Sequence, residues 1–298
     1  MNQFKWGHDM FEDYLDFDIE PFKEKIKKKV YEMYEDDLGS GDVTTEAVIK
    51  PMKIKAIIKV KDDGILAGMF EARSLLEKVG IKVKELIKEG SDIKKGDIVI
   101  EMEGDARKIM QTERTVLNFL TRLSGIATLT NKMAKETKTK LAATRKTCFS
   151  FSDKRAVKIG GGYTHRLGLF DMYLIKGNHI DTVCKELKCS RVEAIKECLR
   201  RVRERKDGKK IEIEVESVEE ALAAAEEKPD IIMLDWVKIP DVKNVVKLLK
   251  KSGICIEASG GVTPDNVKEF GETGVDFVSS GYITYSCKSL DMSLEVLK

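Results

Sequence analysis

Apolar and polar residues follow a helical period over much of the first 140 residues. Apolar side chains recur every three or four positions through residues 20–34, 70–79 and 105–136, which predicts three helices. Residues 53–60 instead alternate between polar and apolar positions, and 90–103 carries strand-like runs with glycine turns. The first part of the chain therefore indicates a mixed α+β domain.

The pattern changes after residue 140, where short apolar runs alternate with amphipathic helices. Predicted strands cover 141–144, 172–176, 211–215, 231–235, 254–258 and 275–279, and predicted helices cover 191–205, 218–225, 242–250 and 264–272. Strands and helices that alternate at this interval imply parallel βαβ units. Because no G-x-G-x-x-G turn follows the first strand, an α/β barrel is favoured over a dinucleotide-binding sheet.

Length, charge and hydropathy narrow the classes of protein that fit. A chain of 298 residues has room for two domains. Its 53 Lys and Arg residues nearly balance 51 Asp and Glu, whereas nucleic-acid binders carry a basic excess. No apolar run approaches about 18 residues and no signal peptide is evident, so we expect a soluble, cytoplasmic protein. The six cysteines form no C-x-x-C pair, which argues for reduced cysteines and against structural zinc.

Chemistry-bearing residues follow the carboxyl ends of the predicted barrel strands, where active sites of such barrels lie. They are Thr144-Arg145-Lys146-Thr147, Lys176, Glu214, Asp235, Ser259-Gly260-Gly261 and Ser280-Gly281. The two glycine turns favour phosphate binding by backbone N–H groups and by the helix predicted to begin at Pro264. The alternative is a tight turn that merely needs glycine.

The acidic and basic residues of this set point to different parts of a ligand. Glu214 and Asp235 end adjacent predicted strands and could hold Mg²⁺, bind ribose hydroxyls or stabilise a cationic sugar transition state. A single acid there would more often be a helix cap or a surface pair. His165 and Arg166 follow a triple-glycine turn, and with Arg145, Lys146 and Lys176 they suit a multiply anionic ligand.

Taken in order, the motifs resemble those of the quinolinate phosphoribosyltransferase family from about residue 35 to residue 297. The matching segments are EDDLGSGDVTT (35–45), ERTVLNFLTRLSGIAT (113–128), TRKT (144–147), KRAVKIGGGYTHRLGLFDMYLIKGNH (154–179), IEIEV (211–215), IIMLD (231–235), EASGG (257–261) and TGVDFVSSG (273–281). So many ordered matches are far more specific than any single motif.

The resemblance implies a fold, a reaction and an assembly. The fold is an N-terminal α+β sandwich-like domain at 21–135, joined by the C-terminal segment 283–298, and an incomplete TIM-like α/β barrel at 136–282. Residues 1–20 form an extension. The reaction is that of a decarboxylating pentosyltransferase, which converts quinolinate and phosphoribosyl diphosphate, with Mg²⁺, to nicotinate mononucleotide, diphosphate and CO₂ in NAD biosynthesis. The assembly is a homodimer, or a higher oligomer, with active sites shared between subunits.

The resemblance also implies roles for single residues. Arg145, His165, Arg166 and Lys176 would bind the quinolinate carboxylates, together with Arg114 from the partner subunit. The catalytic set would be Lys146 at the diphosphate, with Glu214 and Asp235 at the ribose and, directly or indirectly, the metal. The 5′-phosphate would meet Ser259, Gly260, Gly261, Ser280 and Gly281.

Four segments depart from the family pattern and keep alternatives open. The departures are the run Cys148-Phe149-Ser150-Phe151-Ser152 and the residues Gly177, Trp236 and Tyr285. They represent either drift around an intact site or a related transferase with a different aromatic acid acceptor. A third hypothesis, a non-catalytic paralogue, is disfavoured because Lys146, Glu214 and Asp235 are retained. The surplus of cations favours a dicarboxylate acceptor.

Overall fold

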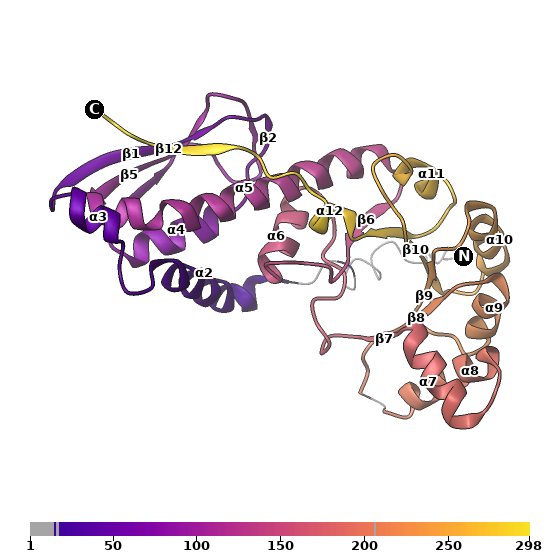
Figure 1. The fold of residues 1–298 in the computed structure, drawn as a ribbon. Coiled ribbons are helices and arrows are strands. Elements are labelled where there is room, and N and C mark those ends of the chain that lie inside the picture. Colours follow the sequence, from indigo (N-terminus) through magenta and orange to yellow (C-terminus); the bar gives the residue numbers. More distant parts are fainter. Residues whose placement is uncertain (1–14, 16–17, 206) are drawn as a thin grey trace, which may run out of the picture. The chain divides into compact units, whose positions relative to one another are not determined.

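The computed structural model describes residues 15, 18–205 and 207–298, which divide into two compact units (Figure 1). The N-terminal unit comprises Asp18–Asn131, Thr147–Gly161 and Ile283–Lys298, and the barrel unit comprises Lys132–Lys146 and Gly162–Tyr282 together with Leu15. Residues 147–161 group with the N-terminal unit, although the predicted range 136–282 includes them. Most of the predicted extension at 1–20 lies outside the described residues.

The N-terminal unit is built on an antiparallel sheet with the strand order β12-β1-β5-β3. These strands are β12 (Met292–Val296), β1 (Lys53–Val60), β5 (Ile98–Asp105) and β3 (Lys82–Glu85). Ile58 of β1 pairs with Leu294 on one side and with Ile100 on the other. The C-terminal strand β12 thus closes the edge of β1, and a small second sheet pairs β2 (Gly64–Ile65) with β4 (Asp92–Ile93).

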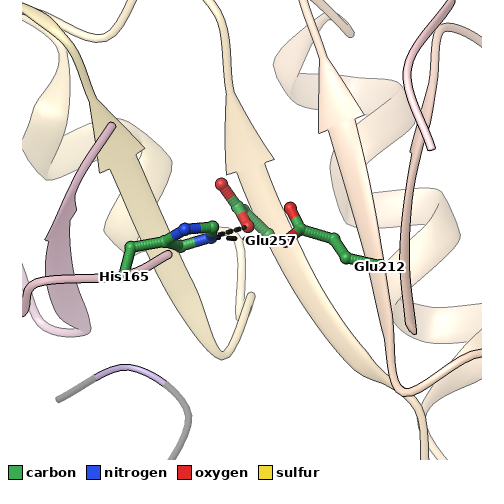
Figure 2. A group of neighbouring side chains, drawn as sticks. All are labelled: His165, Glu212 and Glu257. Atoms are coloured by element: carbon green, nitrogen blue, oxygen red, sulfur yellow. Dashed lines mark hydrogen bonds and ion pairs between the residues drawn. The ribbon is translucent and has the colours of Figure 1, made fainter. Parts of the chain in front are cut away.

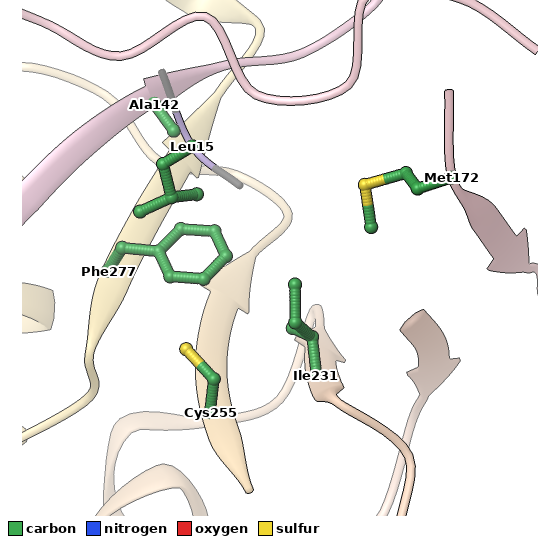
Figure 3. Close-up of a cluster of buried hydrophobic side chains, with 6 residues drawn as sticks. All are labelled: Leu15, Ala142, Met172, Ile231, Cys255 and Phe277. Atoms are coloured by element: carbon green, nitrogen blue, oxygen red, sulfur yellow. The ribbon is translucent and has the colours of Figure 1, made fainter. Parts of the chain in front are cut away.

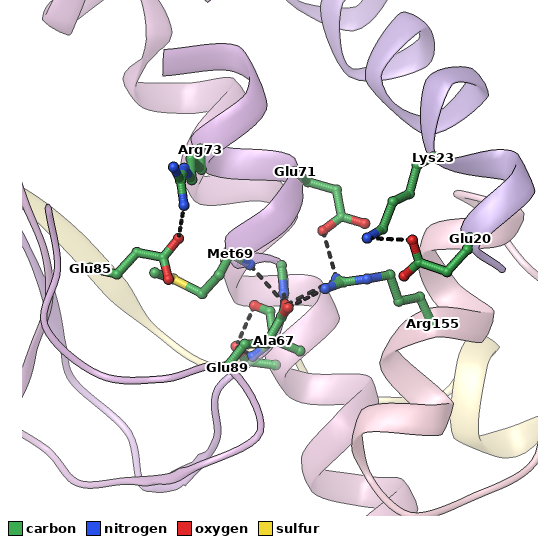
Figure 4. A network of polar contacts seen from close by, with 11 residues as sticks. Glu20, Lys23, Ala67, Met69, Glu71, Arg73, Glu85, Glu89 and Arg155 are labelled. Carbon is green, nitrogen blue, oxygen red and sulfur yellow. Dashed lines mark hydrogen bonds and ion pairs between the residues drawn. The ribbon is translucent and has the colours of Figure 1, made fainter. Parts of the chain in front are cut away.

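Helices complete this unit. They are η1 (Glu20–Phe22), α2 (Lys23–Leu38), α3 (Val43–Val48), α4 (Met69–Lys78), α5 (Ala106–Glu136), α6 (Phe151–Ile159) and α12 (Tyr282–Tyr285), of which α5 and α12 extend into barrel-unit residues. A buried ionic network links two of them, because Arg155 of α6 pairs with Glu71 of α4 and with Glu89 (Figure 4). None of the helices in the described part of the chain combines the length and apolar character that a membrane crossing requires.

The barrel unit contains six parallel strands in the order β6-β11-β10-β9-β8-β7. The strands are β6 (Lys140–Ala143), β7 (Tyr173–Ile175), β8 (Ile211–Val215), β9 (Ile231–Asp235), β10 (Cys255–Ser259) and β11 (Phe277–Ser280). The helices are α7 (Gly177–Leu187), α8 (Arg191–Arg203), α9 (Val218–Glu226), α10 (Ile239–Leu249) and α11 (Val267–Gly271). Because β6 and β7 end the strand order without pairing with each other, the barrel is open, and the predicted fold class is confirmed.

A cluster of buried apolar side chains lies at the end of the sheet opposite the predicted site. Leu15, Ala142, Met172, Ile231, Cys255 and Phe277 form one buried cluster (Figure 3). Ile231 and Cys255 begin their strands and pair in register, so this cluster lies at the amino ends of β9 and β10. A core at this end leaves the carboxyl ends of the strands for polar chemistry.

Candidate active site

The predicted site residues follow the carboxyl ends of the parallel strands, which meet at one edge of the sheet. The register pairs Asp235 at the end of β9 with Ser259 at the end of β10. It also pairs Ala143 at the end of β6 with Ser280 at the end of β11. Parallel pairing therefore brings six separate segments of the sequence to one edge.

The acidic residues lie among lysines at this edge. Lys176 Nζ is 3.1 Å from Glu214 Oε2, and the Gly177 N–H donates to the other Glu214 oxygen at 3.4 Å. Burial raises the pKa of Asp235 and the neighbouring Glu214 raises it further, while Lys176 and Lys146 oppose the rise. These interactions place Lys146, Lys176, Glu214 and Asp235 in one electrostatic neighbourhood.

The arginines form a second, cationic part of the site. Arg166 is buried, and its Nε donates to the Gly168 carbonyl at 2.7 Å. Burial lowers the pKa of Arg166, and the charge of nearby Arg145 lowers it further, against the weaker opposing charge of Asp171. Two guanidinium groups that repel each other in a partly desolvated place are stabilised by a bound anion.

The predicted phosphate turn contains two consecutive glycines with positive φ. Gly260 and Gly261 have φ values of +81° and +66°, which side-chain-bearing residues rarely adopt. The Ser280 hydroxyl donates to the Val262 carbonyl at 2.7 Å, so the second glycine turn is tied to the first. Helix α11 begins at Val267, later than the predicted Pro264, because the turn before it is closed by its own hydrogen bonds.

Trp236 lies directly on this turn. Its backbone also has a positive φ of 58°, and 74% of its surface is exposed. A Cβ atom on Gly261 would come within 2.8 Å of the indole, and one on Gly260 within 2.7 Å. The two glycines are therefore required both by their φ angles and by the indole that covers them.

A buried polar cluster joins His165 to two glutamates that the sequence analysis did not single out (Figure 2). His165 Nε2 is 3.1 Å from Glu257 Oε2 and 3.5 Å from Glu212 Oε2, and both glutamates are fully buried. Burial raises the pKa of Glu257 to about 7. Burial also raises the pKa of Glu212 well above its ordinary value, and the charge of Glu257 adds to the effect. The sequence pattern that could have indicated this cluster is a glutamate at an inward-facing position of an otherwise apolar strand.

Two other predicted features belong to the N-terminal unit. Arg114 lies on α5 and is exposed, and its side chain has no hydrogen bond or ion pair to any residue that the structure describes. Phe149 packs against Phe119 with ring centroids 4.8 Å apart, and Phe151 stacks on Phe22 at 4.4 Å. The aromatic residues of the altered loop are thus engaged in packing within this unit.

Comparison with known proteins decides the family. Two family models match the chain. The model described as "Quinolinate phosphoribosyl transferase, N-terminal domain" matches residues 42–124, and the one described as "Quinolinate phosphoribosyl transferase, C-terminal domain" matches residues 126–295. The chain belongs to the quinolinate phosphoribosyltransferase family. The resemblance found in the sequence is therefore confirmed.

Similar members of the family come from archaea and bacteria. A "Probable nicotinate-nucleotide pyrophosphorylase (carboxylating)" of Methanocaldococcus jannaschii is 42% identical over 289 residues, covering 92% of this chain and 97% of the relative. A Bacillus subtilis protein of the same description is 35% identical, with 91% and 93% covered. The solved nicotinate-nucleotide pyrophosphorylase of Francisella tularensis superposes with a TM-score of 0.82 at 33% identity, with 92% and 97% covered.

Proposed function

We propose that this protein transfers a phosphoribosyl group from phosphoribosyl diphosphate to the ring nitrogen of quinolinate and releases CO₂. The product, nicotinate mononucleotide, is a precursor of NAD. The observation that carries the proposal is the meeting of arginines, carboxylates and a glycine turn at one edge of the barrel in a member of this family.

A dicarboxylate acceptor suits the cationic part of the site. Arg145 is close enough to Arg166 to disfavour the charge of Arg166, and an anion bound between them would remove that repulsion. Lys176 can bind the acceptor only by sharing its charge with Glu214, to which it is paired. We therefore assign the quinolinate carboxylates to Arg145, Arg166 and Lys176. His165 is left out of this set because both its ring nitrogens bond to the protein.

The sugar phosphate suits the opposite part of the site. The backbone N–H groups of the Ser259-Gly260-Gly261 turn and of Ser280-Gly281 would hold the 5′-phosphate, as oriented amides do in anion-binding loops. Ser280 acts mainly by tying the two turns together, because its hydroxyl donates to Val262. The ribose then lies toward Glu214 and Asp235, on the neighbouring strands.

Glu214 and Asp235 also fit the magnesium ion that the family implies. The pKa of Asp235 is raised partly by the charge of Glu214, and a divalent cation between the carboxylates would relieve that repulsion. Carboxylate oxygens combined with substrate phosphates are the usual ligands of Mg²⁺. When bound, the ion supplies positive charge to the leaving diphosphate.

The chain's own residues carry the remaining chemistry. As the bond from ribose C1 to the diphosphate oxygen breaks, positive charge develops on the sugar, and the carboxylates of Glu214 and Asp235 stabilise it. Lys146, close to Asp235, offsets the charge of the leaving diphosphate. Arg145 and Arg166 hold the ring nitrogen in line to form the new bond. The ring is then cationic, so the bond between its C2 carbon and the adjacent carboxylate can break with the electron pair left on C2; CO₂ leaves, and C2 takes a proton from water.

The proposal includes a shared active site in a homodimer. Arg114 is an exposed arginine without a partner among the described residues, as expected for a side chain that serves another subunit. It would add a further cation to the quinolinate carboxylates. A cytoplasmic location stays a prediction from the sequence.

A second candidate is a related transferase with a different aromatic acid acceptor. Trp236 is the observation that favours it, because an exposed indole lies on the phosphate turn. The test supplies purified protein with phosphoribosyl diphosphate, Mg²⁺ and one acceptor at a time: quinolinate, nicotinate or picolinate. We expect turnover with quinolinate alone, and preferred turnover of a monocarboxylate would favour the second candidate.

A further inference from the structure

The imidazole of His165 has no nitrogen left for a substrate. The backbone N–H of Arg166 donates to His165 Nδ1 at 2.6 Å, and a backbone amide can only donate. Nδ1 is therefore unprotonated, and the ring proton is on Nε2, which donates to Glu257 Oε2 at 3.1 Å. His165 is only 6% exposed, so its ring belongs to the barrel interior (Figure 2).

The hydrogen bonds continue beyond Glu257 to the phosphate turn. The Ser279 hydroxyl donates to Glu257 Oε1. A second contact of 2.9 Å joins the hydroxyls of Ser279 and Ser259. Because Ser279 has one proton and gives it to the carboxylate, Ser259 donates in that second bond. A continuous chain of bonds therefore runs from Arg166 through His165, Glu257 and Ser279 to Ser259.

The backbone of His165 is held in an uncommon conformation. Its φ is 51°, in the left-handed region that costs a residue with a side chain about 1 kcal/mol or more. The His165 N–H donates to the Leu15 carbonyl at 2.7 Å, and the ring bonds hold the other side. These hydrogen bonds hold the left-handed conformation at the residue directly before Arg166.

We propose that His165 and Glu257 are positioning residues that fix the Arg166 turn relative to the Ser259 phosphate turn without touching substrate. The inference rests on the proposed function, since it concerns the two ligand-binding parts of that same site. Arg166 is at one end of the hydrogen-bond chain and Ser259 is at the other. Glu257 is fully buried, so it acts only through these neighbours.

A small displacement of the Arg166 turn should lower the rate of the reaction strongly. Displacing a substrate-holding group by about 1 Å can cost about 100-fold in rate. Removing the acceptor for the His165 proton by Glu257→Leu should therefore lower kcat/KM for quinolinate about 10- to 100-fold. Glu257→Gln retains a carbonyl oxygen that can accept the same hydrogen bond, so it should restore most of the activity.

The tautomer of His165 can be tested on the wild-type protein without any substrate. ¹⁵N NMR of histidine-labelled protein at pH 8 should contain a neutral Nε2–H signal that disappears in His165→Asn and is thereby assigned to His165, apart from the similar signal expected of His179, whose Nδ1 accepts from the Lys176 N–H. Adding quinolinate should leave the tautomer unchanged. An Nδ1–H ring, an imidazolium, or a change of protonation on quinolinate binding would overturn the proposal.

A double-mutant cycle tests the coupling between the two residues. His165→Asn and Glu257→Leu should each lower kcat/KM. The kcat/KM of the double variant should equal that of the less active single variant, because both substitutions interrupt the same chain of hydrogen bonds. Multiplying effects, or a loss confined to His165→Asn, would show that His165 acts directly on substrate. If wild-type protein fails to turn over quinolinate, the proposed function fails, whereas the NMR result still decides the tautomer.

Discussion

Replacing Glu257 with glutamine should change how the stability of the protein depends on pH. The pKa of this buried carboxyl is raised from an ordinary value of 4.5 to about 7, chiefly by burial. Between these values the folded protein holds a proton that the unfolded chain has lost. The free energy of unfolding of the wild type therefore falls as pH rises through this range. The full difference corresponds to about 3 kcal/mol.

Urea unfolding at pH 5 and pH 8 measures this effect. At pH 5 the wild type has already lost part of this stability. Between the two pH values the free energy of unfolding of Glu257→Gln should therefore rise by about 2–3 kcal/mol relative to that of the wild type. Any pH-independent change in packing cancels in this comparison. Glu219→Gln, at an exposed position on α9, is the control and should follow the wild type. A constant difference between Glu257→Gln and the wild type, or a relative loss at pH 8, would refute the reasoning.

Three substitutions test the site itself. Arg145→Ala should raise the quinolinate KM and lower kcat, with a combined cost of about 2–4 kcal/mol, because a charge-assisted partner is lost; unchanged steady-state kinetics would remove Arg145 from the site. Glu214→Gln should mainly lower kcat, because charge stabilisation at the sugar is lost in the transition state; near wild-type turnover would make Glu214 structural. Arg114→Ala should be inactive alone and should regain activity in heterodimers with an Asp235→Asn subunit, and failure to regain it would contradict a shared site.

The barrel could be predicted because its strands are short apolar runs. The predicted strand 211–215 and the predicted strand 231–235 agree with β8 and β9 to the residue. Helix α3 was not predicted, because it begins after Asp42, whose carboxylate accepts from the Thr44 and Thr45 N–H groups in a segment that otherwise reads as a turn. A six-residue helix of this kind depends on its cap and is too short for a period to appear.

The site could be predicted only in part, for a related reason. Parallel strands bring their carboxyl ends together, so Glu214 and Asp235 could be placed side by side from the sequence. Glu212 and Glu257 could not, because an acid inside a strand is ordinarily expected at the surface and their burial depends on the whole barrel. Nor could the sequence reveal that Phe149 packs against Phe119 within the N-terminal unit, since that contact joins residues far apart in the sequence.

Isotopic labelling of quinolinate tests the central claim most directly. Wild-type protein receives phosphoribosyl diphosphate, Mg²⁺ and quinolinate labelled with ¹³C in the carboxyl group next to the ring nitrogen. We predict that labelled CO₂ and unlabelled nicotinate mononucleotide form in equal amounts. Nucleotide that retains the label, or the absence of any nucleotide product, would contradict the assignment of this site to quinolinate.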